Sequence, residues 1–154
     1  MNRKDYLDSN VSVVVSLDCA RFVMKKFRYY EYDPVIYPRK LWVCVGGGIT
    51  DIAKTFDDKD GSDKVISEEY VENSDALTFP AILHESMDYG VVVWLHRLSA
   101  VDDATVTHEA IHAENFMFSQ LGVALDLEND EAQAYLGGFI GSCIAKTLKK
   151  ARQK

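Results

Sequence analysis

The sequence predicts an α+β protein in which a strand-rich front part is followed by two helices. Two observations carry this prediction. Up to about residue 96, β-branched and aromatic residues gather in short runs separated by turn residues, as strands require. From about residue 102 onward, apolar residues recur at helical spacing. We therefore expect an N-terminal antiparallel or mixed sheet, then one helix, then a C-terminal helix antiparallel to it.

The front part begins with three apolar runs. Residues 11–17 are rich in valine and predict a strand, whereas residues 19–30 suit either a helix or a strand. Residues 41–45 predict a buried strand, and the three glycines at residues 46–48 favour a turn after it. Thr50 is placed to cap a short helix beyond that turn.

An acidic, turn-rich segment separates these runs from a predicted β-hairpin. Residues 57–75 are expected to form mostly surface loop, with one short helix or strand near residues 65–71. Residues 81–84 and 91–96 then predict two strands, because each is an apolar run and a turn signal at residues 87–90 lies between them.

The back part predicts two helices with defined ends. Asp102 or Asp103 can cap the first helix, which is expected to end at Gly122. The second helix is expected to begin near Asn129, with Asp126 or Asn129 as its cap, and to reach the basic C-terminal tail. Acidic residues near its start and lysines near its end suit the helix dipole.

Composition and charge argue against several classes of protein. The chain of 154 residues carries a net charge of −7, which repels phosphate backbones, so we expect no nucleic-acid partner. No apolar run reaches the roughly 20 residues of a membrane helix, and residues 11–17 resemble a strand more than a signal peptide. Cys19, Cys44 and Cys143 lack paired spacing and suggest buried thiols in a reducing compartment. We therefore expect a cytoplasmic protein without membrane contact.

The first predicted helix carries the sequence His108-Glu109-Ala110-Ile111-His112. Residues four apart lie on one helical face, so the two imidazoles can bind one ion at the Zn–N distance of about 2.0–2.1 Å. Glu109 lies roughly a quarter-turn away, where it can reach a metal-bound water and act as general base. The motif therefore predicts a Zn²⁺ site with two histidine ligands and one catalytic glutamate, although such ligands admit other divalent ions.

The positions along this helix separate into an apolar and a polar face at about 100° per residue. The apolar stripe consists of Val106, Ala110, Ala113, Met117 and Leu121. The polar side consists of His108, His112, Asn115 and Ser119. The helix is therefore expected to bury one face and to direct the histidine pair away from the core.

A zinc site of this type needs a third protein ligand. Glu131 follows the motif after a stretch long enough for a turn, a short loop and a returning antiparallel helix. Glu128 and Asp126 are rivals in the preceding loop or cap, and His84 is a further candidate. We expect Glu131 to be the third ligand.

Two histidines and a motif glutamate, followed by a glutamate on the next helix, resemble the gluzincin branch of the zincin metallopeptidases. The resemblance covers about residues 91–145. It implies a zinc-dependent metalloendopeptidase that hydrolyses peptide bonds of a protein or peptide substrate, with Glu109 activating water. The residues that would bind Zn²⁺ are His108, His112 and Glu131. The resemblance also implies a strand beside the active-site helix that holds extended substrate by β-augmentation, here residues 91–96.

The sequence departs from related zincin patterns at three positions. Asn115 and Phe118 stand where the metzincin branch has a glycine and its third histidine. Tyr135 stands where thermolysin-like sequences have an aspartate that orients the first histidine. The residues that could take over that contact are Asn115, Asp102 and Asp103. Tyr135 lies one turn after Glu131 and is a candidate to donate a hydrogen bond to the oxyanion formed during hydrolysis.

These patterns together predict a single zincin-like domain over residues 1–154. Residues 1–100 would form its strand-rich part, and residues 101–150 its two-helix metal-binding part.

Two other functions fit the same sequence. One is a non-catalytic zinc-binding protein, a degenerate zincin with a structural or assembly role, which would be associated with the virion if it were encoded by a phage. A fourth protein ligand such as His84, His96 or a cysteine would favour it, because structural zinc sites are usually closed. The other is a metal-free interaction domain whose aromatic segment, residues 27–37, forms a partner surface.

Overall fold

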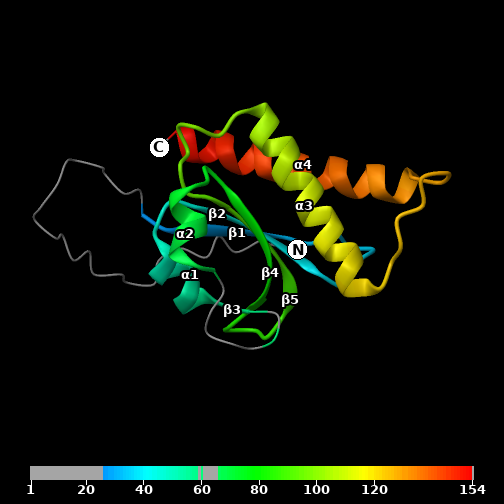
Figure 1. Cartoon of the computed structure of the whole chain (residues 1–154), viewed down its shortest axis with the longest axis horizontal. Helices are drawn as coiled ribbons and strands as arrows, with labels where there is room; N and C mark the ends of the chain where they lie inside the picture. The colour runs from blue at the N-terminus through cyan, green and yellow to red at the C-terminus, as the bar shows by residue number, and fades with distance from the viewer. Residues whose placement is uncertain (1–25, 59, 61–65, 154) are drawn as a thin grey trace, which may run out of the picture.

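The computed structural model describes residues 26–58, 60 and 66–153, which form a mixed sheet with helices on both faces (Figure 1). In chain order the elements are β1 (Arg28–Tyr32), β2 (Lys40–Val45), α1 (Ile49–Thr55), β3 (Phe56–Asp58), α2 (Glu68–Glu72), β4 (Leu77–Leu83), β5 (Tyr89–Leu95), α3 (Asp103–Leu121) and α4 (Glu131–Arg152). The predicted α+β class, with the sheet first and the long helices last, is confirmed. The strand predicted at residues 11–17 lies outside the described residues, as does Cys19.

The sheet has five strands in the order β1-β2-β5-β4-β3. β2 and β5 are parallel, whereas the other three pairs are antiparallel. The predicted hairpin is confirmed as β4 and β5, although β4 begins at Leu77, earlier than the apolar run at residues 81–84 indicated. β5 is the central strand, with β2 on one side and β4 on the other.

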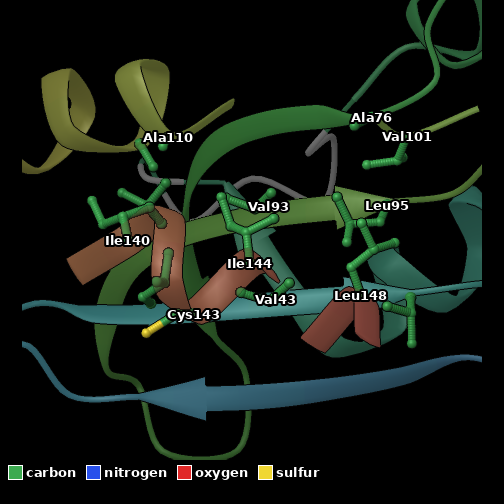
Figure 2. Close-up of a cluster of buried hydrophobic side chains, with 14 of the residues drawn as sticks. Val43, Ala76, Val93, Leu95, Val101, Ala110, Ile140, Cys143, Ile144 and Leu148 are labelled. Carbon is green, nitrogen blue, oxygen red and sulfur yellow. The ribbon is translucent and has the colours of Figure 1, made fainter. Parts of the chain in front are cut away.

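Successive side chains of the central strands enter two different cores, because both faces of the sheet are covered. Val43, Val93 and Leu95 face α4, where Figure 2 shows them beside its apolar side chains. Those side chains are Ile140, Cys143, Ile144 and Leu148. On the opposite face Trp42 and Trp94 pack with side chains of α1 and β3. This arrangement explains why β2 from Leu41 to Val45 and β5 from Val91 to Leu95 are continuously apolar rather than alternating.

The ends of α3 agree with the sequence prediction. The Asp102 carboxylate accepts a hydrogen bond from the Thr105 backbone N–H, and Gly122 ends the helix in the left-handed region at φ 67°. A glycine adopts that conformation at little cost. α4 starts at Glu131, after Asp130, so its cap is neither Asn129 nor Asp126 as predicted. It then runs back obliquely across α3 (Figure 1).

Two short helices complete the fold. α1 follows Gly48, whose backbone N–H donates to the Asp51 carboxylate, so Gly48 rather than Thr50 is the N-cap. The uncertain element near residues 65–71 is the helix α2 at residues 68–72. None of the helices in the described parts of the chain is long and apolar enough to cross a membrane.

Candidate metal centre

The histidine pair lies on the outer face of α3. The predicted split of the helix is confirmed: Ala110, Ala113 and Met117 are buried, whereas His108 and His112 are exposed. The two Nε2 atoms are 3.0 Å apart, and the rings meet edge to face with centroids 4.6 Å apart. The two Nε2 atoms therefore lie within hydrogen-bond distance of each other on the exposed face of the helix.

This separation fits two ligands of one zinc ion. Two nitrogens bound at about 2.0–2.1 Å can stand at most about 4.2 Å apart, and a tetrahedral angle places them about 3.3–3.4 Å apart. The observed 3.0 Å lies slightly inside the tetrahedral distance. The pair can therefore hold a divalent ion after a shift of a few tenths of an ångström.

The motif glutamate points elsewhere. Glu109 is only 6% exposed, and its Oε2 accepts a hydrogen bond from the Thr78 hydroxyl of β4 at 2.5 Å. The described hydrogen bonds thus join Glu109 to the sheet and the two histidines to each other. Glu109 is placed to anchor α3 on β4, and a role as general base requires it to exchange Thr78 for a water molecule.

The predicted third ligand is not brought to the pair. Glu131 is exposed at the first position of α4, and within residues 26–58, 60 and 66–153 no three His, Cys, Asp or Glu side chains are grouped to hold a metal ion. The rivals Glu128 and Asp126 lie in the exposed loop before α4, where the Asp126 carboxylate accepts from the Glu128 backbone N–H. Two of the three predicted ligands therefore lie together.

The other candidate ligands are engaged at a distance from the motif. His84 pairs with Asp57 at 3.7 Å, and His96 Nε2 is 3.1 Å from the Ser74 hydroxyl. Cys44 and Cys143 are buried, as expected, and burial raises the pKa of the Cys44 thiol well above its usual value. A thiolate ligand from Cys44 is therefore disfavoured.

Tyr135, Asn115, Asp102 and Asp103, the other polar positions named for the site, are exposed. Tyr135 is 75% exposed on α4, so it is not a core tyrosine. Asn115 is exposed on the histidine face of α3, whereas the Asp102 carboxylate is occupied with Thr105 at the start of the helix. Hydrogen bonds from the Thr105 backbone and hydroxyl lower the pKa of Asp102.

The strand expected to hold substrate is the wrong one. Residues 91–96 belong largely to β5, whose two edges are both paired, so it cannot accept an added strand. β4 has the available edge: β3 pairs with its residues 81–83, and no described strand pairs with residues 77–80 on that side.

The backbone of β4 is suited to such an addition. The Leu83 N–H points to the β5 side and the His84 N–H to the β3 side, so even-numbered residues direct their polar groups to the available edge. Thr78 therefore presents its N–H and C=O there, and Pro80 has no N–H to leave unpaired. The same Thr78 holds Glu109, so this edge lies beside the motif.

Sequence reasoning missed two residues of this region. Thr78 carries no motif signal. Glu114 is only 4% exposed, is hydrogen-bonded to the Gln133 side chain and lies against Gly137 of α4. Desolvation raises its pKa, and the bond with Gln133 partly offsets that rise. Helical spacing could have identified Glu114, because it follows the buried Ala110 by one turn.

Comparisons of the chain with protein-family models, with curated proteins and with solved structures found no match.

Proposed function

We propose that the chain is a zinc-dependent metallopeptidase in which His108 and His112 hold the metal ion. The observation that supports it most directly is the 3.0 Å separation of their Nε2 atoms on one exposed helical face. A glutamate between two such histidines is the arrangement that activates water in metallopeptidases. Glu109 occupies that position, and the available edge of β4 lies beside it.

The chain's own residues would divide the chemistry as follows. A bound zinc ion would supply a nucleophile near neutral pH, because it would lower the pKa of a coordinated water molecule to about 7. Glu109 would accept a proton at its carboxylate and pass it to the leaving amine. An extended peptide would add to β4 at residues 77–80. Tyr135, whose side chain is exposed, would donate a hydrogen bond to the oxyanion.

The proposal requires one movement. Glu131 is its third ligand, so the start of α4 has to approach the histidine pair. The segment that would allow it, residues 122–130, contains no helix or strand and is exposed throughout. Movement of this segment would carry Glu131 and Tyr135 to the histidine pair at the same time, because they lie one turn apart on α4.

The first experiment measures zinc per chain in the purified protein. Wild type and His84→Ala should each bind the metal, and His112→Ala should lose it. His84 is the matched control, because it is also an exposed histidine but pairs with Asp57. For the third ligand, Glu131→Gln should weaken zinc binding and Glu128→Gln should not. Zinc retained by His112→Ala would overturn the proposed site.

The second experiment separates catalysis from binding. Glu109→Gln should keep its zinc and slow the cleavage of an unfolded protein substrate by about 10²–10⁴-fold, the usual contribution of a general base. Undiminished cleavage by this variant would contradict the proposed mechanism.

A non-catalytic zinc-binding protein is the second candidate. The observation that favours it is the engagement of Glu109 with Thr78 beside a histidine pair that is open to solvent. Zinc binding that depends on His112, with no cleavage by the wild type, would support this alternative over the peptidase.

A further inference from the structure

The outer face of α3 carries almost no charge. After Asp103 at its first position, none of the exposed residues of this helix is Asp, Glu, Lys or Arg. The α3 outer face consists of Ala104, Thr107, His108, Ile111, His112, Asn115 and Ser119. Charged residues make up 27% of the chain. An exposed surface depleted of charge is typical of the centre of a protein–protein interface.

The histidine pair lies in the middle of this face and is an incomplete metal site. It offers two nitrogens, and the described residues add no third ligand of the usual types. A closed zinc site has four protein ligands. A twofold contact between identical helices would supply the missing two, because such a contact places the same patch of both copies together.

We propose that two copies of this chain pair through the α3 outer face and share one divalent metal ion, bound by His108 and His112 of each copy. The inference rests on the metal-binding half of the proposed function and not on hydrolysis. Four protein ligands leave no open position on the ion, so the shared site would be of the closed, structural type.

The surface chemistry points to a second copy as the occupant. A net charge of −7 makes two copies repel each other over most of their surface, whereas the α3 outer face brings no like charges together. Ala104, Thr107 and Ser119 are small, so two helices can approach to the usual interaxial distance of about 8–10 Å. Ile111, which is 50% exposed beside His112, would be covered in the contact.

The test measures the molar mass of the full chain in solution together with its zinc content. Adding Zn²⁺ to chelator-treated protein should double the mass from 17.4 kDa, with one zinc per two chains, and chelator should reverse both changes. His112→Ala should stay at the single-chain mass, and His84→Ala should pair like wild type. Ile111→Glu leaves all four ligands in place but sets two charges in the contact, so it should weaken pairing at least tenfold.

Each outcome decides one question. One zinc per single chain, with no change in mass, overturns the pairing and keeps the proposed metal site. Pairing that ignores chelator or His112→Ala overturns the shared ion. No zinc bound at any concentration overturns both this inference and the proposed function. Circular dichroism of each variant shows whether the fold is retained, and the substituted positions are exposed.

Discussion

The two glutamates buried along α3 are held by different partners. Glu109 accepts from the Thr78 hydroxyl of the sheet, whereas Glu114 is bonded to Gln133 of the neighbouring helix. Buried carboxylates cost free energy unless they are hydrogen-bonded, and each of these has one partner from a different element. The same helix therefore fixes its position against both the sheet and α4 through carboxylates, while its histidines face outward.

Glu114 should make the stability of the protein depend on pH. Desolvation raises its native pKa above the ordinary 4.5. Between 4.5 and that raised value, the native state holds a proton that the unfolded state has released, so stability falls as pH rises through this window. Glu114→Gln removes the titrating group, and Gln can still bond to Gln133. Relative to this variant, wild type should gain stability as pH falls from neutral towards 4.5.

Urea unfolding of both proteins across this pH range measures the effect. The difference between them should be constant well above the native pKa and should change only within the window. Two parallel stability profiles would show that the carboxylate of Glu114 is solvated as well in the native state as in the unfolded chain.

The contact between α3 and α4 depends on a glycine opposite a carboxylate. A Cβ atom on Gly137 would lie 2.4 Å from the Glu114 Oε2, whereas one on Gly138 would meet nothing within 4 Å. Gly137→Ala therefore forces Glu114 away from Gln133 and should destabilise the protein by about 1 kcal/mol. Gly138→Ala should instead stabilise it by about 0.5–1 kcal/mol, because alanine is the better helix former.

A double-mutant cycle identifies the cause. In a Glu114→Ala background the clash is gone, so Gly137→Ala should become as stabilising as Gly138→Ala. Chemical denaturation of the four proteins gives the coupling free energy. If Gly137→Ala remained destabilising without the Glu114 carboxylate, the close approach of the two helices would have another origin.

Local signals predicted the elements well where caps and spacing act within a few residues. Asp102 and Gly122 define α3, and the apolar stripe through Ala113 identifies its buried face, because both depend on helical geometry alone. Hairpin pairing of β4 and β5 follows from their short turn. β3 was not predicted, because three residues are too few to show a pattern.

Features that depend on distant segments could not be predicted in the same way. The insertion of β2 beside β5 joins segments separated by three elements and a hairpin strand, so no local signal marks it, and it makes β5 central. For the same reason, sequence spacing could not predict where Glu131 lies relative to the histidine pair. The position of Glu131 depends on how α4 crosses α3, and that crossing follows from side-chain packing.

At the scale of the molecule, the sheet is covered on each face by a pair of helices, and the two helical layers differ in the core that they form. α1 and α2 lie over one face, and α3 and α4 cover the other with the larger core. The histidine pair stands on the outside of that second layer, with the buried face of α3 fixed beneath it. A regular helix therefore presents the two imidazoles, so these two ligands bind a metal ion without any ordering of their own backbone.

Zinc should consequently stabilise the folded chain by simple mass action. A ligand that binds only the native state at 100 times its dissociation constant adds about 2.7 kcal/mol to stability. For a domain of this size each kcal/mol corresponds to about 2–4 °C, so the Tm should rise by about 5–10 °C. His112→Ala should show no such rise, and His84→Ala should show the full one. An equal rise in His112→Ala would mean that zinc binds elsewhere, and a fall in the wild type would mean that it prefers the unfolded chain.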